Sequence, residues 1–199
     1  MTRRTTIRFA LAAAAALALS VAAGPAAESG NKVLVEMKTN AGTVVLELWP
    51  DVAPKTVENF LRYVREGFYD GTIFHRLAPG FVIQGGGYTE DLKEKPTHEP
   101  IPLEAKKSNR KYTIAMARTN DPNSATSQFY INLADNTFLD PGARPESPDG
   151  YAVFGKVVKG QQVIDFMAST KTRRLDPPFT DLPERTLKIE SMKILEQAP

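Results

Sequence analysis

The sequence predicts an antiparallel all-β protein with two helices. Eight segments have the alternating or continuously apolar character of strands, and only two segments show helical periodicity. Their order lacks the regular strand–helix alternation of a parallel α/β sheet. A chain of 199 residues, of which 42% are hydrophobic and 24% charged, is sufficient for one domain with a substantial core.

The first 26 residues are typical of a cleavable secretory signal. Three arginines within residues 3–8 form a basic start, an Ala/Leu-rich stretch follows at residues 9–23, and small residues close the segment. The apolar stretch is about 15 residues long, shorter than the roughly 20 that span a bilayer. We therefore expect cleavage after Ala23 or Ala26, with an uncleaved membrane anchor as the alternative.

The remainder, residues 27–199, is predicted to be a single domain with nearly balanced charge. Removing three arginines from 25 basic residues leaves 22, against 23 acidic ones. Such a balance gives no electrostatic reason to expect a nucleic-acid partner. With no cysteine and only His75 and His98, the chain lacks the residues of a thiolate or histidine metal cluster, so we expect neither metal nor cofactor.

The predicted domain opens with a hairpin and a helix. Residues 33–37 and 44–48 alternate as strands, and the turn between them ends at Gly42, which predicts a three-residue loop. Residues 54–64 then repeat apolar side chains at helical spacing, with Pro54 in the first turn and Gly67 as the stop.

A second hairpin carries the chemically informative residues. Residues 73–77 and 81–84 read as strands joined by a Pro-Gly turn, and Arg76 and Gln84 interrupt their apolar pattern. If the strands pair, both side chains can reach one face beside Phe81 and form a site that holds an apolar group while donating hydrogen bonds. The alternative is a hairpin whose Arg76 and Gln84 only face water. His75 would lie on the opposite face, where we expect a hydrogen-bonded structural role.

The remaining elements follow the same logic. Residues 85–87 are three glycines, which indicate a bulge or a close backbone approach rather than a phosphate loop, since no Lys-Ser/Thr follows. His98 falls in a proline-containing loop and is expected to be solvated. Further strands are predicted at residues 112–117, 128–132, 153–158 and 187–195, and a short helix at residues 160–169. No serine lies in the G-x-S-x-G pattern of a hydrolase nucleophile.

Several blocks, in the same order, closely resemble the cyclophilin family of peptidyl-prolyl cis-trans isomerases, and particularly its bacterial periplasmic branch. The similarity extends from about residue 33 to residue 195. It implies a closed eight-stranded antiparallel β-barrel with a helix covering each end. The blocks are Pro54-Lys55-Thr56-Val57-Glu58-Asn59-Phe60, Phe74-His75-Arg76, Pro79-Gly80-Phe81, Gln84-Gly85-Gly86, Ser127-Gln128-Phe129-Tyr130 and Val153-Phe154-Gly155-Lys156-Val157.

The resemblance also implies a site. Arg76 would be the catalytic donor with Gln84 beside it. Phe138 stands where many members have the tryptophan that helps to bind cyclosporin, so cyclosporin binding is expected to be weak. The residues implied to contact substrate are Phe81, Val82, Ala117, Arg118, Gln128, Tyr130, Phe138, Leu139 and Tyr151.

The expected function is isomerisation of Xaa-Pro bonds in unfolded or flexible proline-containing polypeptides, assisting the folding of exported proteins. We expect a monomer in the periplasm, with no stable membrane association after signal cleavage; a secreted or membrane-anchored form is the alternative. Two other functions stay open. One is a proline-peptide binding module or holdase without significant isomerase activity. The other, a carrier of apolar ligands, is weaker because abundant Val, Ile, Leu and Phe would fill a small barrel.

Overall fold

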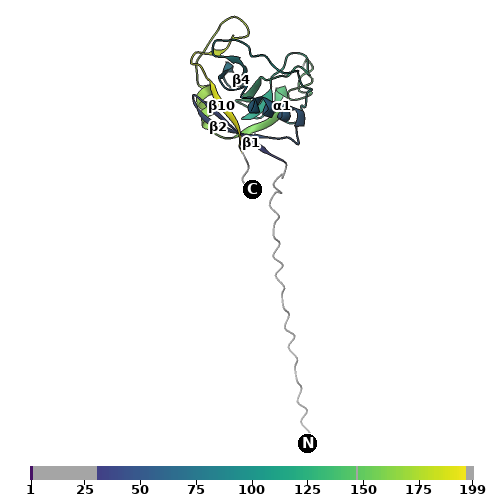
Figure 1. Cartoon of the computed structure of the whole chain (residues 1–199). Helices are drawn as coiled ribbons and strands as arrows, with labels where there is room; N and C mark the ends of the chain where they lie inside the picture. The colour runs from purple at the N-terminus through teal and green to yellow at the C-terminus, as the bar shows by residue number, and fades with distance from the viewer. Residues whose placement is uncertain (2–30, 147, 196–199) are drawn as a thin grey trace.

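The computed structural model describes Met1, residues 31–146 and residues 148–195. Within these ranges the chain forms one eight-stranded antiparallel sheet and two helices (Figure 1). The predicted signal segment and its cleavage positions lie outside the described residues. Neither helix in the described part of the chain is long and apolar enough to cross a membrane.

The predicted eight strands and two helices are confirmed. The order of strands across the sheet is β10-β1-β2-β7-β5-β6-β4-β3. The elements are β1 (Val33–Thr39), β2 (Gly42–Leu48), α1 (Pro54–Arg65), β3 (Thr72–Ala78), β4 (Val82–Thr89), β5 (Thr113–Met116), β6 (Phe129–Asn132), the 3-10 turn η1 (Thr137–Leu139), β7 (Val153–Lys159), α2 (Gln161–Ala168) and β10 (Ile189–Leu195). A separate pair, β8 (Thr172–Arg173) and β9 (Leu182–Pro183), was not predicted.

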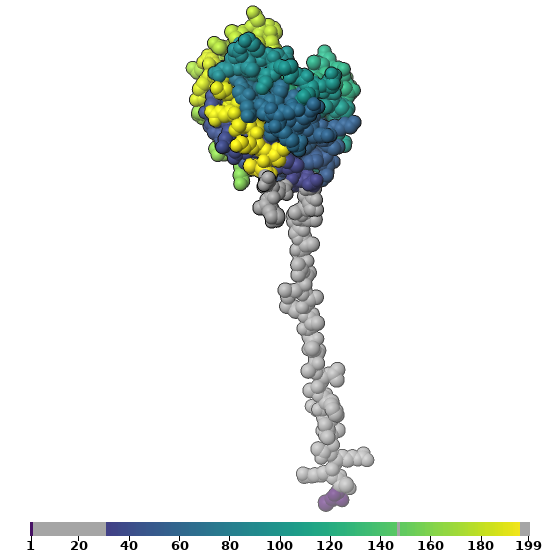
Figure 2. All heavy atoms as spheres, viewed as in Figure 1, coloured from purple at the N-terminus to yellow at the C-terminus, as the bar shows by residue number. Residues whose placement is uncertain are grey.

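The sheet curls until its two edge strands meet. The Gly71 backbone N–H donates to the Ile189 carbonyl at 2.9 Å, and the Phe74 N–H donates to the Leu187 carbonyl at 2.8 Å. The contact between β3 and β10 is therefore a short bridge rather than a continuous ladder. On its other side β10 pairs fully with β1, and in Figure 2 it is visible as the yellow strip beside the purple residues of the first strands.

The concave side of the curled sheet is filled by side chains. Phe60 of α1 lies at the centre, with its ring centroid 5.6 Å from that of Phe129 and 5.2 Å from that of Phe154. Both helices contribute to the same buried cluster, α2 through Ile164 and Met167. A packed interior is expected for a small barrel, and it removes the basis for the apolar-ligand carrier.

Helix α1 has the predicted ends and an additional cap that the local sequence did not reveal. Pro54 occupies the first turn, and Gly67 follows the helix with φ of 63°. The carboxylate of Glu104, from the long loop after β4, accepts hydrogen bonds at 2.9 Å from both the backbone N–H and the hydroxyl of Thr56. A carboxylate at a helix N-terminus is favoured by the helix dipole, so the loop is anchored to the helix.

Two smaller expectations were wrong. The β1–β2 loop has two residues instead of three, because Gly42 (φ 137°) already pairs with Thr39. His98 is half-buried instead of solvated: its Nε2 lies 2.7 Å from a Glu66 carboxylate oxygen, and its backbone N–H donates to the Tyr63 hydroxyl at 2.9 Å.

Candidate functional site

The register of five strands builds a row of residues on the outer face of the sheet. Arg76 on β3 pairs with Gln84 on β4, and Gln84 pairs with Tyr130 on β6. Tyr130 in turn pairs with Ala115 on β5, which pairs with Val153 on β7. Since successive residues of a strand point to opposite faces, this row faces outward while the residues between fill the interior.

A cavity of about 510 Å³ lies over this row. Its volume is within the usual range for a ligand pocket. Ten of the residues that the sequence predicted for the site line it, together with one that was not predicted. The lining residues are Arg76, Phe81, Val82, Gln84, Ala117, Arg118, Tyr130, Phe138, Leu139, Arg144 and Tyr151.

The floor of the cavity is apolar and rigidly packed. Val82, Tyr130 and Leu139 are at most 5% exposed and form one cluster with the fully buried Ala115 and Val153. Beside this floor stands Phe81, whose ring stacks on that of Phe138 with centroids 5.5 Å apart and planes 25° apart. Such a surface can hold a flat or puckered apolar ring without offering it a reactive group.

Arg76 places a guanidinium at the edge of this floor. Its Cζ lies 5.8 Å from the centroid of the Phe81 ring, and its Nε lies 3.6 Å from a carboxylate oxygen of Asp181. The backbone carbonyl of Asp181 accepts a bond from the Leu77 N–H at 2.9 Å, which fixes this acidic residue beside β3. Sequence reasoning missed Asp181 because it comes from a distant, proline-rich loop.

Gln84 is oriented by Gln128, which was predicted as a site residue but is not among the residues that line the cavity. The Gln84 Nε2 donates to Gln128 Oε1 at 3.0 Å. Gln128 packs so closely on β4 that a Cβ at Gly87 would lie 2.6 Å from its Cγ, and a Cβ at Gly85 would lie 2.9 Å from the Ile73 carbonyl. The predicted bulge or close approach is confirmed: backbone approaches closely at Gly85, and the register shift between Ile73 and Phe74 leaves Gly86 and Gly87 as extra residues on β4.

Tyr130 is held by a buried polar network that the sequence did not reveal. Its hydroxyl donates to Asn109 Oδ1 at 2.8 Å, and the Asn109 side chain donates to Asp140 Oδ1 at 3.0 Å. Burial raises the pKa of Tyr130 well above its usual value, so the hydroxyl stays neutral. Burial alone would raise the pKa of Asp140, but hydrogen bonds from Ser108 and Asn109 lower it overall. The network fixes the floor, since Asp140 directly follows Leu139.

Arg118 and Tyr151 form the opposite rim. The Arg118 Nε donates to the Gly150 carbonyl at 3.0 Å, and its Nη1 donates to the Thr119 carbonyl at 2.8 Å. Its Cζ lies 4.6 Å from the centroid of the Tyr151 ring. The neighbouring Ala117 N–H donates to the Gln128 carbonyl at 2.9 Å. This rim is therefore held largely through backbone groups.

His75 is buried at an irregularity in β3, between Phe74, which packs in the core, and Arg76, so simple alternation does not define its face. It is 2% exposed, and its ring meets those of Tyr88 and Phe179 edge-on at centroid distances of 4.7 and 6.3 Å. The expected structural hydrogen bond is absent at Nδ1, which has no partner among the described residues. Burial, together with the nearby Arg76 charge, lowers the pKa of His75 to about 4, so the imidazole is neutral.

Comparison with known proteins decides the family. The family model described as cyclophilin type peptidyl-prolyl cis-trans isomerase matches residues 34–194. The chain belongs to this family. It is a cyclophilin-type peptidyl-prolyl cis-trans isomerase, as predicted.

Several bacterial proteins are similar to this cyclophilin along most of their length. It is 53% identical to peptidyl-prolyl cis-trans isomerase cyp18 of Streptomyces antibioticus over 163 residues, which cover 81% of this chain and 98% of the relative. It is 45% identical to peptidyl-prolyl cis-trans isomerase A of Dickeya dadantii over 189 residues, covering 94% and 97%. It is 46% identical to peptidyl-prolyl cis-trans isomerase B of Escherichia coli over 165 residues, covering 82% and 100%.

Solved structures agree on the fold. A cyclophilin type peptidyl-prolyl cis-trans isomerase from Cryptosporidium parvum superimposes with a TM-score of 0.67 at 23% identity, covering 84% of this chain and all of the other. The cyclophilin AquaCyp293 from Hirschia baltica gives the same TM-score at 25% identity, covering 85% of this chain and 78% of the other. The curled sheet with two helices is thus the cyclophilin fold.

Arg144 is the cavity residue that sequence reasoning missed. It belongs to the irregular segment between η1 and β7, and its Cζ lies 5.5 Å from the centroid of the Phe138 ring. The available signal was weak: one basic residue a few positions after Phe138 and Leu139, in a loop without periodicity.

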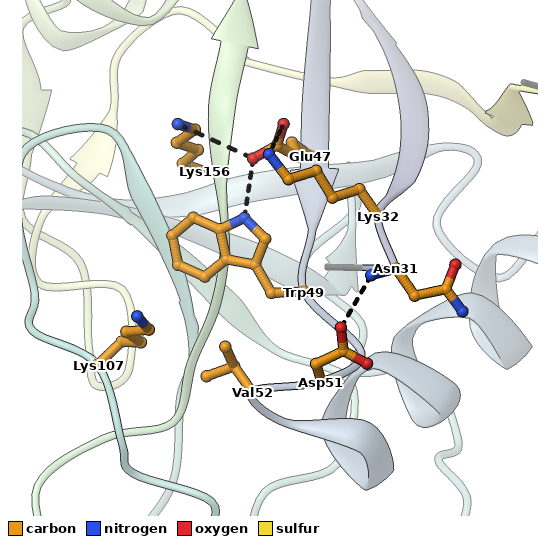
Figure 3. Close-up of a pocket in the computed structure, with 8 residues that line it drawn as sticks. All are labelled: Asn31, Lys32, Glu47, Trp49, Asp51, Val52, Lys107 and Lys156. Carbon is orange, nitrogen blue, oxygen red and sulfur yellow. Dashed lines mark hydrogen bonds and ion pairs between the residues drawn. The ribbon is translucent and has the colours of Figure 1, made fainter. Parts of the chain in front are cut away.

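A second cavity, of about 480 Å³, surrounds Trp49 (Figure 3). Its main carboxylate, Glu47, accepts a bond from Trp49 Nε1 at 2.9 Å and pairs with the amines of Lys32 and Lys156 at 3.4 and 3.8 Å. Burial would raise the pKa of Glu47, but these partners lower it overall. These four side chains pair with one another, and we take the cavity at Arg76, with its apolar floor, as this cyclophilin's candidate site.

Proposed function

We propose that this cyclophilin isomerises Xaa-Pro bonds in the cavity over the outer sheet face, with Arg76 as catalytic donor. The observation that supports the proposal is the strand register. It brings the Arg76 guanidinium to the edge of the same apolar floor that Val82, Tyr130 and Leu139 form. A proline ring fits such a floor, and the charged donor would lie beside the amide that precedes the ring.

The reaction requires no covalent chemistry. Resonance gives the peptide bond a rotation barrier of about 18–20 kcal/mol, and Xaa-Pro bonds exchange in tens to hundreds of seconds. In the twisted transition state the nitrogen lone pair is no longer delocalised. A donor aimed at that nitrogen stabilises the twisted amide more than the planar one, which is the requirement for catalysis. Arg76 offers several donors on a permanently charged group.

Arg76 would not act alone. An acceleration of about 10⁵-fold needs about 7 kcal/mol, whereas one hydrogen bond from a charged group contributes roughly 1.5–3 kcal/mol. The remainder would come from a floor that fixes the ring while the preceding carbonyl rotates, and from exclusion of water. Gln84, held by Gln128, and the edge at Ala117–Arg118 would contact the substrate backbone. Burial of one ring contributes only about 1.5–3 kcal/mol, so substrate affinity should be near millimolar.

The test uses NMR exchange to measure how fast matched variants isomerise one Xaa-Pro peptide. Arg76→Ala should lower kcat/KM at least about 100-fold, equivalent to about 2.7 kcal/mol. Arg76→Lys should also be poor, because a point charge does not reproduce the guanidinium geometry. Arg62→Ala is the control, since this exposed arginine pairs with Glu66 on α1.

Two outcomes would contradict the proposal. An Arg76→Ala variant that retains most of the activity would show that the role is wrongly assigned. A wild type that binds the peptide without accelerating exchange would instead favour the binding-module or holdase function.

We further infer that this cyclophilin acts in the periplasm on exported polypeptides, as part of the bacterial periplasmic branch. Residues 1–26 have the order of a secretory signal. The alignment with the Dickeya dadantii relative covers 94% of the chain and therefore includes part of that segment. N-terminal sequencing of the exported protein tests the inference.

A further inference from the structure

Arg144 places a positive group at the rim of the cavity, with its ion-pair partner at the long distance of 4.0 Å. Its side chain is 32% exposed, and its Nε is buried without a hydrogen-bond partner among the described residues. The closest carboxylate oxygen recorded for it belongs to Glu146, at 4.0 Å, and that side chain is 70% exposed. The Arg144 Cζ lies 5.5 Å from the centroid of the Phe138 ring, so the guanidinium is also supported by an aromatic side chain of the cavity.

The charges around the cavity add to this effect. Arg76 is partly balanced by Asp181 at 3.6 Å, and the hydrogen bonds of Arg118 include those to the backbone carbonyls of Gly150, Thr119 and Asn120. The carboxylate of Asp140 accepts bonds from Ser108 and Asn109 on the far side of the floor. Three arginines therefore line the cavity, and no Asp or Glu is among the described residues that line it.

We propose that Arg144 makes this cyclophilin prefer substrates with an acidic residue next to the proline. The inference rests on the proposed function. With the ring seated on the floor beside Phe81, the adjacent residue lies about 3.3–3.6 Å further along the chain. The Phe138 ring stacks on Phe81 with centroids 5.5 Å apart, and the Arg144 Cζ lies 5.5 Å from the Phe138 centroid, so the guanidinium lies within about 11 Å of the Phe81 ring. One residue of extended chain and the length of an acidic side chain together cover most of this distance. A Glu or Asp side chain can therefore reach the guanidinium, and a Lys side chain is repelled.

The expected preference is modest and sensitive to salt. Exposed ion pairs contribute little, so we expect kcat/KM for a Glu peptide to exceed that for the matched Lys peptide by about threefold to fivefold at low ionic strength. Raising the salt concentration to about 1 M, where the Debye length is about 3 Å, should reduce the ratio towards one.

The experiment measures kcat/KM by NMR exchange for peptides with Glu, Ala or Lys directly before proline, and for a second series with these residues directly after it. NMR avoids a coupled protease with its own charge preference. The variants are Arg144→Gln and Arg144→Lys. The control is Arg185→Gln, which removes an equal charge from an arginine stacked over an exposed ring, Phe166, at 4.9 Å, outside the cavity lining.

The expected result is an order of Glu over Ala over Lys in at least one series for the wild type, Arg144→Lys and Arg185→Gln. In Arg144→Gln the Glu-to-Lys ratio should fall towards one. A ratio unchanged in Arg144→Gln, including a parallel loss for all peptides, would overturn the inference, as would a wild type without preference. Absence of exchange with every peptide would instead overturn the proposed function and the inference with it.

Discussion

Protonation of His75 should destabilise the folded protein under mildly acidic conditions. The imidazole is 2% exposed between two aromatic rings, and its pKa is lowered from 6.5 to about 4 by burial first and the Arg76 charge second. Between pH 4 and 6.5 the unfolded chain takes up this proton while the folded chain does not. Stability therefore rises with pH through that window, is fully present above pH 6.5, and is lost as pH falls towards 4.

The magnitude follows from the shift. A lowering of about 2.5 pKa units, at 1.36 kcal/mol per unit, corresponds to about 3 kcal/mol. That is a large part of the roughly 5–15 kcal/mol that stabilises a typical domain. At pH 4.5, two units below the unfolded value, about 2.5 kcal/mol should already be lost.

The assay is urea unfolding at pH 7 and pH 4.5, with His75→Phe as the variant. Phenylalanine keeps a ring against Tyr88 and Phe179 but cannot take up a proton, so any packing difference is the same at both pH values. Carboxylates titrate in both proteins and cancel in the comparison. The wild type should lose about 2.5 kcal/mol more than the variant. Equal losses in the two proteins would show that His75 is not the acid-sensitive group.

Three further outcomes are expected. Cyclosporin should inhibit the wild type weakly, and in an inhibition titration Phe138→Trp should bind the drug at least about tenfold more tightly. The indole N–H can add a hydrogen bond of roughly 0.5–1.5 kcal/mol, and the larger ring adds contact area. No gain in affinity would place residue 138 away from the drug. Gly87→Ala should cost about 1–3 kcal/mol in thermal unfolding and lower kcat/KM, because its Cβ would displace Gln128 from Gln84; unchanged values would contradict that contact. Intact mass should show an exported chain that begins between Ala23 and Glu28, and a membrane-retained chain that begins at Met1 would refute cleavage.

Local patterns made much of the fold predictable. Alternation and short apolar runs located all eight main strands, and the proline and glycine signals placed the ends of α1 correctly. The strands β8 and β9, of two residues each, are too short to carry any period. The turn at Gly42 was misjudged because glycine can end a loop or begin a strand, and only pairing with Thr39 decides between these.

Much of the candidate site was also accessible, but its supports were not. Arg76 and Gln84 stand out in the sequence because each interrupts an apolar strand, and one turn connects them. Asn109 and Asp140 look like ordinary loop residues, since their bonds to Tyr130 and to each other join segments more than 20 residues apart. Nothing local distinguishes a buried asparagine in a loop from an exposed one.

The alternation of the central strands separates stability from activity. On β4, Ile83 points into the filled interior, whereas Val82 and Gln84 line the outer cavity. On β6, Ile131 and Tyr130 divide in the same way. Whether a strand residue points inward or outward therefore decides whether its substitution affects stability or activity. Truncating Ile83 leaves a cavity in the core and should cost about 2–5 kcal/mol of stability. Gln84→Ala removes only a half-buried amide and its bond to Gln128, so it should lower kcat/KM while the unfolding transition stays nearly unchanged. If both substitutions lowered stability equally, Gln84 would be part of the core. The separation of a stabilising inner face from a functional outer face would then be wrong.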